Sequence, residues 1–425
     1  MPAPPEHAVA ESHIIARVHA SVLDVDPQAW NALLAQQAHA TPFMRHEYLA
    51  ALETSGSATP RTGWTPRFLT LWDAGVLVAA CPLYLKTHSY GEYVFDWAWA
   101  SAYEQHGVPY YPKALVAVPF TPVPGSRLLA RDATARAQLV QAARQWCMEE
   151  DISSLHLLFA AEEDIATCAD QGLMLRHTVQ FHWQNTAPVA PVVSSEATSE
   201  WLAMPNRFTS FDDFLASLTQ EKRKKIKQER RRVADAGVTF RCLQGKAIST
   251  GDWDFFYRCY ERTYLEHGNP PYLSRAFFAD MARTMPEAWV LFIAERDGQP
   301  IASSLIAISA CPASATGQKD TEIIAYGRYW GALERVDCLH FEACYYQPLQ
   351  WCIEHGVHRF EGGAQGEHKM ARALLPVQTS SAHWLAHPAF ADAVERFLER
   401  EGEGVDAYLQ SLHERAPFRK TQNPP

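Results

Sequence analysis

Residues 323–361 have the sequence IIAYGRYWGALERVDCLHFEACYYQPLQWCIEHGVHRFE, and this stretch decides the fold. Apolar runs at Ile323–Tyr326 and His358–Phe360 predict two strands, and residues 340–355 between them predict a helix. A strand, a helix and a second strand make one βαβ unit, in which both strands end at the same edge of a sheet. Because ligands bind in the crevice beyond such strand ends, we expect the segments that follow the two strands to share a binding site.

The two halves of the chain repeat the same order of elements. Residues 68–83 predict a strand, a tight turn and a strand, and residues 290–308 predict the same hairpin. Farther along, the tripeptide Gln-Trp-Cys occurs at 145–147 and again at 350–352, each time in a predicted helix that leads into a strand. We interpret this order as a duplication, so the sequence predicts two α/β copies of one fold.

The length of the chain, 425 residues, exceeds the usual ~150-residue domain, so at least two cores are expected. The stretch 186–205 is rich in Pro, Ser, Ala and Thr and has no clear periodicity, which is typical of a linker or insertion. We therefore expect a first lobe at residues 14–185, the linker at 186–205 and a second lobe at 206–418.

The composition excludes several classes of protein. The net charge of −10 argues against a surface that binds polyanions all over, so any nucleic-acid contact must be local. Nine cysteines, without a Cys-x-x-Cys pair, are typical of reduced thiols in the cytoplasm, where we expect the protein. No apolar stretch reaches ~18 residues, so neither a membrane span nor a secretion signal is expected. The pair His355 and His358 lacks the glutamate of a zinc-binding helix, so we expect no metal site.

A glycine-rich loop follows the second strand of the βαβ unit. The sequence Glu361-Gly-Gly-Ala-Gln-Gly-Glu-His-Lys369 has three glycines, which forbid a regular helix or strand, beside charged and imidazole side chains. A turn with solvated charges is one interpretation, and a ligand loop is the one we prefer. A carboxylate or an imidazole there could accept a proton from an attacking amine, so Glu367 and His368 are the first catalytic candidates. The binding candidates in this segment are Glu361, Gly362, Gly363, Gln365, Lys369 and Arg372.

The aromatic strand before the helix carries further candidates. Tyr326 is a third catalytic candidate, and the residues after it offer donors and flat faces to a carboxylate or phosphate group. An aromatic core strand with one exposed arginine is an equally good interpretation of this segment. Glu342 lies near the start of the predicted helix, and a second interpretation is that its charge simply stabilises the helix dipole. The binding candidates on this strand and helix are Arg328, Tyr329, Trp330, Glu342 and Tyr346.

Two segments outside the βαβ unit are also candidates. In the first lobe an aromatic loop contains Tyr103 and His106, which could line an elongated substrate or simply cover the core. The stretch 221–232 predicts a helix with cationic faces, either solvated or in contact with RNA or a phosphate-bearing lipid. The basic residues available for a tRNA contact are Lys222, Arg223, Lys224, Lys225, Lys227, Arg230, Arg231 and Arg232.

The runs YGRYWG, LHFEACYYQPLQWCIEHG and RFEGGAQGEHKMARALLP, together with SSAHW at 380–384, resemble a bacterial FemAB-like family of GNAT-type acyltransferases. The similarity extends from about Val18 to Phe418. The resemblance implies an α/β fold of two tandem GNAT-like lobes in a Fem-type architecture, with the active site in the second lobe. It also implies that an amine attacks an acyl ester or thioester, so that an acyl or aminoacyl group passes to an amine acceptor, for example in a peptidoglycan precursor.

The resemblance leaves the donor open. Fem enzymes use aminoacyl-tRNA and GNAT enzymes use acyl-CoA, so both are expected donors. Residues 332–339 lack the Arg/Gln-x-x-Gly-x-Gly/Ala loop of GNAT enzymes that bind acetyl-CoA, which argues against acetyl-CoA itself. Two non-catalytic functions stay open: a protein that recognises a cell-wall precursor in the same cleft, and an RNA-binding module centred on 221–232.

Overall fold

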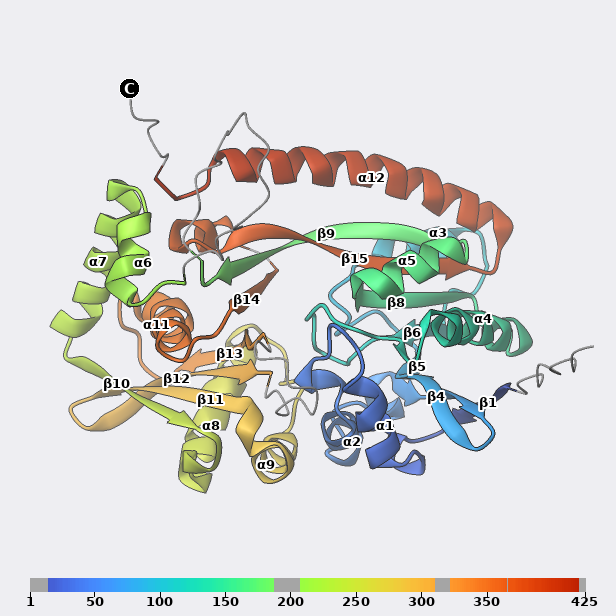
Figure 1. Ribbon diagram of the computed structural model, residues 1–425, viewed down its shortest axis with the longest axis horizontal. Helices are drawn as coiled ribbons and strands as arrows, with labels where there is room; N and C mark the ends of the chain where they lie inside the picture. The colour runs from blue at the N-terminus through green and yellow to red at the C-terminus, as the bar shows by residue number, and fades with distance from the viewer. Residues whose placement is uncertain (1–13, 187–206, 310–321, 365, 420–425) are drawn as a thin grey trace, which may run out of the picture. The chain divides into compact units, whose positions relative to one another are not determined.

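The computed structural model describes residues 14–186, 207–309, 322–364 and 366–419, which form two compact units (Figure 1). Unit 1 consists of residues up to Glu53, Ala58–Arg176 and Ser380–Leu398, and unit 2 consists of Thr54–Ser57, His177–Thr379 and the residues from Glu399 onward.

The units differ in extent from the expected lobes. The chain passes from unit 1 into unit 2 within strand β9 (Met174–Gln184). The second half of β15 (Leu375–Leu385) belongs to unit 1, because it pairs with β8 (Ser154–Ala160) there. Periodicity read along the sequence cannot detect such a return. Most of the expected linker at 186–205 lies outside the described residues, so the linker stays a prediction.

Unit 1 carries strands in the orders β1-β3-β4-β7 and β15-β8-β6-β5-β2. Its other strands are β1 (Ile14–His19), β2 (Trp64–Pro66), β3 (Phe68–Asp73), β4 (Val76–Cys81), β5 (Leu83–Lys86), β6 (Lys113–Val116) and β7 (Leu129–Ala130). Its helices are α1 (Pro27–Leu34), α2 (His46–Thr54), α3 (Trp97–Gln105), α4 (Ala133–Glu149) and α5 (Glu162–Asp170). The apolar side of α4, which includes Leu139, Val140 and Ala143, packs into one core with strands β3, β4 and β8.

Unit 2 carries strands in the order β10-β11-β12-β13-β14-β9. The strands are β10 (Val238–Gln244), β11 (Trp289–Arg296), β12 (Gln299–Ile308), β13 (Ile324–Ala332) and β14 (Arg359–Ala364). The helices are α6 (Phe211–Ser217), α7 (Gln220–Asp235), α8 (Thr250–Glu266), α9 (Arg275–Thr284), α10 (Leu339–Phe341) and α11 (Gln347–Glu354). A π-helical turn at Glu342–Tyr346 joins α10 to α11, and a 3₁₀ helix at Glu367–Arg372 follows β14. Helix α12 (Pro388–Glu414) begins in unit 1 and ends in unit 2.

Each unit contains the predicted hairpin, and in each unit the predicted helix and the strand after it belong to a βαβ unit. The central turn residues have positive φ in both hairpins, at +48° for Ala74 and +83° for Gly75, and at +52° for Asp297 and +72° for Gly298. Such angles define the turn whose twist matches two paired strands. Parallel pairs join β6 to β8 across α4, and β13 to β14 across α11. The order of elements that was interpreted as a duplication is therefore present in both units.

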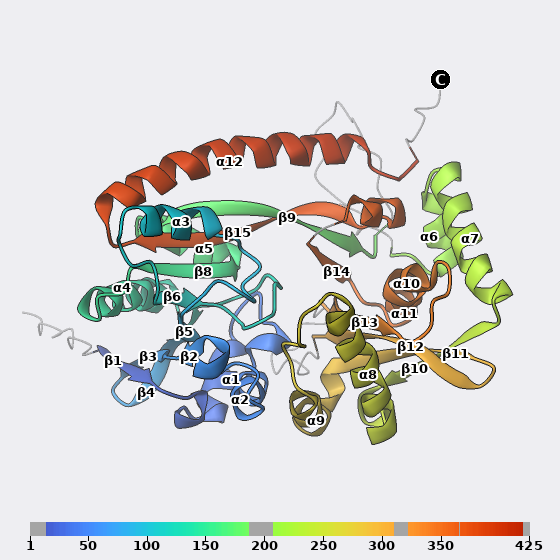
Figure 2. The same cartoon turned by 180° about the vertical axis from the view of Figure 1, so that it is seen from behind.

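Helices cover both faces of strands β12 and β13. A Cβ atom at Gly331 would lie 1.9 Å from the carbonyl oxygen of Cys259, so α8 contacts β13 backbone to backbone and only glycine fits there. On the other face, the Ser304 hydroxyl donates a hydrogen bond to the carbonyl oxygen of Ala343 in the π-helical turn. In both views α8 and α11 lie on opposite sides of these strands (Figures 1 and 2).

Candidate active site in unit 2

A cleft opens in unit 2 where strands β13 and β14 part. The two strands pair in parallel over only three residues of each, from Ile324 opposite Arg359 to Tyr326 opposite Glu361. Strand β13 then continues to Ala332 along β12 alone. The cleft has a volume of about 160 Å³ and is lined by Ser304, Leu305, Ile306, Gly327, Arg328, Tyr329, Trp330, His340, Cys344, Tyr345, Phe360 and Gly362. The structure therefore brings the predicted segments 326–331 and 361–372 to one pocket through Arg328, Tyr329, Trp330 and Gly362.

Two glycines keep the floor of the cleft narrow. A Cβ atom at Gly327 would lie 3.0 Å from Cζ of Phe360. At Gly362 it would lie 2.3 Å from Cδ2 of Leu374 and 2.9 Å from the carbonyl oxygen of Phe181. Close packing therefore requires glycine at position 362, which lines the cleft.

A tyrosine and a histidine form a hydrogen-bonded pair at the cleft. The hydroxyl of Tyr345, which is buried, lies 3.3 Å from Nε2 of His368, which is exposed. Desolvation, followed by the positive charges of Arg372 and Lys369, lowers the pKa of His368, whereas burial raises the pKa of Tyr345. At neutral pH the imidazole is therefore a neutral proton acceptor and the phenol a proton donor. The ring of His340 lies 5.7 Å from that of Tyr345 in an edge-on contact.

The π-helical turn explains why the sequence did not point to Tyr345 or Cys344. Glu342 and Tyr346 are four positions apart, so they would lie on one face of a regular α-helix. The extra residue of a π turn rotates the helix face, and Cys344 and Tyr345 line the cleft instead. Such turns occur often at functional sites, but no residue type announces them.

Lys369 holds the glycine-rich loop rather than facing the cleft. Its buried Nζ donates hydrogen bonds to the carbonyl oxygens of Gly362 at 2.6 Å, Gly363 at 3.3 Å and Ala364 at 2.9 Å. Burial lowers its pKa to about 8. Gly363 and Lys369, which were predicted to bind a ligand, therefore stabilise the conformation of the loop. Gln365, also predicted there, lies outside the described residues.

Arg372 and Tyr346 join a buried network with Glu229 of α7. Nη2 of Arg372 lies 2.7 Å from Oε2 of Glu229, and the hydroxyl of Tyr346 donates a hydrogen bond to the same carboxylate oxygen. Glu342 accepts hydrogen bonds from Arg230 of α7, at 3.1 Å from Nε to Oε1. The predicted binding residues Glu342, Tyr346 and Arg372 thus connect α7 to the helix and loop around the cleft and do not line it.

Glu367, the other first catalytic candidate, points away from the cleft. Its carboxylate is exposed and accepts a hydrogen bond of 3.2 Å from the hydroxyl of Tyr408 in α12. It also forms an ion pair of 2.9 Å with Arg415, which directly follows α12. Tyr326 is buried in β13, and Glu361 is buried in β14, where it pairs with Arg359 at 3.1 Å. Of the predicted catalytic residues, His368 contacts a side chain that lines the cleft, that of Tyr345.

In unit 1, Tyr103 and His106 pack against other side chains of that unit. The buried ring of Tyr103 stacks on Phe390 with 3.8 Å between the ring centroids. His106 is exposed, meets the same ring edge-on, and has Nδ1 2.8 Å from the carbonyl oxygen of Ala102. Tyr103 lies in helix α3 and not in a loop as expected, and His106 caps the end of that helix. These contacts place the segment against a small core of unit 1.

The predicted basic helix exists as α7 and has two distinct faces. Ile226, Glu229 and Val233 are buried. The exposed cations are Lys224, Lys225, Lys227, Arg231 and Arg232, whereas Lys222, Arg223 and Arg230 are half-buried. Lys222 pairs with Glu221 and Arg231 with Asp235, while Arg230 faces Glu342.

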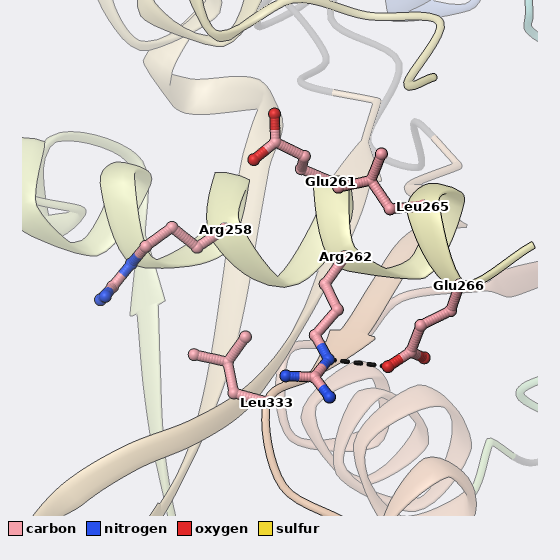
Figure 3. A pocket seen from close by; sticks show the side chains of 6 residues that line it. All are labelled: Arg258, Glu261, Arg262, Leu265, Glu266 and Leu333. Carbon is pink, nitrogen blue, oxygen red and sulfur yellow. Dashed lines mark hydrogen bonds and ion pairs between the residues drawn. The ribbon is translucent and has the colours of Figure 1, made fainter. Parts of the chain in front are cut away.

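A second depression in unit 2 offers no comparable chemistry. It has a volume of about 450 Å³ and is lined by Arg258, Glu261, Arg262, Leu265, Glu266 and Leu333 (Figure 3). Arg262 pairs with Glu266 at 2.7 Å beside Leu333, and Glu261 points to the other side of α8. Its ionic groups are therefore partly neutralised and diverge.

Two features are absent from the part of the chain that the structure describes. Within it, no three His, Cys, Asp or Glu side chains are grouped so that they could hold a metal ion. None of its helices combines the length and the apolar character that crossing a membrane requires.

Solved structures share the fold at low sequence identity. The crystal structure of FemX matches with a TM-score of 0.50 and 10% identity, over 87% of this chain and 98% of that one. The C-terminal domain of a putative lysylphosphatidylglycerol synthetase from Agrobacterium fabrum has a TM-score of 0.49 and 11% identity, over 89% and 97% of the two chains. A tandem GNAT protein from the clavulanic acid pathway has a TM-score of 0.44 and 13% identity, over 88% and 99%. The expected tandem GNAT-like, Fem-type α/β fold is confirmed.

A family model and a search of curated proteins complete the comparison. No curated protein matches the sequence significantly. The model of the FemAB-like family, described as peptidoglycan biosynthesis/recognition, matches residues 21–420, nearly the whole chain. The resemblance noted in the sequence is thereby confirmed, and the chain belongs to the FemAB-like family.

Proposed function

We propose that this chain transfers an acyl or aminoacyl group from an activated donor to an amine, and that the reaction takes place in the cleft between β13 and β14. The observation that carries the proposal is the Tyr345 and His368 pair at the cleft where β13 continues past its pairing with β14. Family membership supports the reaction class, and the family description supports an amine of a peptidoglycan-precursor-like peptide as the acceptor.

The part of β13 beyond its pairing with β14 suits the acyl arm of a donor. Beyond Tyr326 the strand continues along β12, and its residues 327–330 line the cleft. An extended arm that contains amides can pair with a strand edge as an added strand would. A backbone N–H directed at the carbonyl oxygen of the acyl group would stabilise the oxyanion that forms when the amine attacks.

The proton transfers fall to His368 and Tyr345. An amine is protonated at neutral pH and must lose a proton before its nitrogen can attack the acyl carbon. The neutral imidazole of His368 takes that proton, directly or through the Tyr345 hydroxyl. The bond from the acyl carbon to the donor sulfur or oxygen then breaks, and Tyr345 gives its proton to the leaving group. The second proton that the nitrogen releases as the amide forms restores the Tyr345 hydroxyl, and the proton held by His368 passes to solvent. We therefore assign the role of proton acceptor to His368 and not to Glu367, the other candidate from the sequence.

The donor is either acyl-CoA or aminoacyl-tRNA, and α7 favours a donor that carries phosphates. We propose that Lys224, Lys225 and Lys227, which are exposed, contact the phosphates of a tRNA. With three such contacts, a plot of the logarithm of affinity against the logarithm of salt concentration should have a slope of about −2 to −3. Replacing all three by glutamine should flatten that slope.

Identification of the donor comes first. Mass spectrometry of molecules that co-purify with the full chain would distinguish charged tRNA from acyl-CoA. Single-turnover transfer from that donor to an amine-bearing stem peptide then tests the site. Tyr345→Phe and His368→Gln should each slow transfer by about 10²–10⁴-fold. The matched control is Glu367→Gln, in the same 3₁₀ helix, which should transfer at the wild-type rate.

The outcomes separate the alternatives. Full activity of His368→Gln together with loss in Glu367→Gln would refute the proposed assignment. Tight binding of the stem peptide by the wild-type chain without turnover from either donor would favour a recognition protein instead.

A further inference from the structure

Arg372 is a buried cation that fixes the backbone of the proposed base. It is 1% exposed, and its Nη1 donates a hydrogen bond of 2.7 Å to the carbonyl oxygen of His368. Its Nη2 pairs with Glu229 at 2.7 Å, and its guanidinium lies 3.6 Å from the ring centre of Phe341. A planar guanidinium held at three points has no freedom to move independently of its partners. The position of His368 is therefore tied to the carboxylate of Glu229.

Glu229 ties the same network to α7, whose opposite face is cationic. Its side chain is buried and accepts hydrogen bonds from both Arg372 and Tyr346, the neighbour of Tyr345. Lys225, one turn earlier and therefore on the same side of the helix as Glu229, is exposed. The helix thus carries an exposed cation one turn from the buried anion that holds Arg372.

We propose that Glu229 and Arg372 are positioning residues that hold His368 at the cleft from α7, and that an anion bound by the exposed lysines Lys224, Lys225 and Lys227, here called the outer face of α7, acts on the Tyr345 and His368 pair by neutralising the charge of Lys225. The effect on catalysis rests on the proposed function, whereas the hydrogen-bonded connection from Glu229 through Arg372 to His368 does not. A donor whose phosphates occupy the outer face would adjust the site that its acyl group enters.

The charges around His368 set the sign of the expected effects. Desolvation and the positive charges of Arg372, Lys369 and Lys225 lower its pKa, and the negative charge of Glu229 raises it. A positive charge on His368 also acts on His340, whose pKa is lowered first by burial and then by this charge. Removing the charge of Glu229 should therefore lower the pKa of His368 further. Neutralising Lys225, by substitution or by a bound phosphate, should raise it.

Histidine NMR on the full chain measures these shifts without any substrate. The His368 signal is assigned with His368→Gln and titrated in Glu229→Gln and Lys225→Gln. The matched control is Glu221→Gln, which removes the same charge from the same helix at a side chain that is 82% exposed. We expect a downward shift of the pKa for Glu229→Gln, an upward shift for Lys225→Gln, and none for the control. Equal shifts in Glu229→Gln and Glu221→Gln would overturn the link.

The anion is tested with inorganic tripolyphosphate at low salt. In the wild-type chain it should raise the pKa of His368, and in a variant with Lys224, Lys225 and Lys227 replaced by glutamine it should not. No shift in the wild-type chain at saturating tripolyphosphate, judged by chemical-shift changes on α7, would show that the outer face is not linked to the cleft.

A second variant covers the case in which Glu229→Gln fails to fold. Replacing both Glu229 and Arg372 by methionine removes the pair without leaving a lone buried charge, a change that folded proteins tolerate. The His368 signal should then titrate without the influence of either charge, and kcat should fall by about 10–100-fold with KM nearly unchanged. A wild-type kcat in this folded variant would overturn the positioning role. If neither the wild-type chain nor any variant transfers an acyl group, but the expected pKa shifts of His368 are observed, only the proposed function is refuted.

Discussion

Two buried histidines make unit 1 sensitive to acid. Nδ1 of His156 in β8 lies 2.8 Å from Nδ1 of His383 in β15, and both side chains are 1% exposed. One ring must donate and the other accept, so the pair is stable only while at least one Nδ1 is unprotonated. Burial, followed by the charge of Lys113, lowers the pKa of His156 to about 3, and burial, followed by the charge of His156, lowers that of His383 well below its usual value.

The sign and the size of the effect follow from linkage. A histidine whose pKa is lowered in the folded chain contributes stability that is fully present above the unfolded pKa of about 6.5 and is lost as the pH falls below it. Between pH 7.5 and pH 5.5 the unfolded chain binds the proton and the folded chain does not. Over this pH interval each such histidine therefore lowers the unfolding free energy by about 1.4 kcal/mol.

His383→Gln isolates one of the two contributions. Urea unfolding of the full chain at pH 7.5 and pH 5.5, followed by fluorescence, gives the unfolding free energies of wild type and variant. The variant should lose about 1.4 kcal/mol less than the wild type between the two pH values, even if it is less stable at both. His106→Gln, at an exposed site of the same unit, is the control and should behave as the wild type does. A wild-type-minus-variant difference that is the same at both pH values would refute the reasoning.

Three further predictions concern the glycine-rich loop. Gly362→Ala should lower the unfolding free energy by roughly 1–3 kcal/mol, seen as a lower urea midpoint, because the new Cβ would meet Leu374 and the Phe181 carbonyl. Lys369→Met should speed hydrogen exchange of the amides at 362–364, because the carbonyls there lose their common donor. Unchanged exchange would contradict the role assigned to Lys369. Glu367→Gln should change the unfolding free energy by less than about 1 kcal/mol in the same urea assay, because its ion pair is half exposed.

Local chemistry made much of the fold predictable. The hairpins depend on turn residues that adopt positive φ, and Asp297-Gly298 is a strong signal of that kind. The βαβ unit depends on apolar runs separated by a helical pattern, which the sequence also displays. Both signals involve residues within a few positions of one another, so no knowledge of distant contacts was needed. The return of β15 to unit 1 involves β8, more than 200 residues earlier, and left no local signal.

The candidate site was predictable in place but not in detail. The sequence placed the site at the ends of β13 and β14, where the cleft is found, because strand order and connection determine that edge. The direction of each side chain depends on distant partners. Glu367 turns outward because Arg415, 48 residues later, pairs with it. Lys369 turns inward because three carbonyl oxygens of the preceding turn accept its hydrogen bonds.

The same duplicated framework has different strand surroundings in the two units. In unit 1, the edge of β8 beyond Leu157 is occupied by the chain itself: the N–H of Gly125 donates to the carbonyl oxygen of Phe159 at 3.0 Å, and the carbonyl oxygen of Gly125 accepts from the N–H of Ala161 at 3.0 Å. The buried side chain of Arg127 adds a hydrogen bond of 3.1 Å to the carbonyl oxygen of Leu158.

In unit 2 the strands that follow the parallel pairs part instead, and the space between them is the cleft. A segment that satisfies its own strand edge has no backbone groups to offer an extended ligand, because each N–H and carbonyl is already used. The backbone that could pair with a donor is therefore found where β13 leaves β14, and this is also where Tyr345 and His368 meet. Strand pairing thus favours unit 2 as the place of the proposed chemistry without reference to side chains.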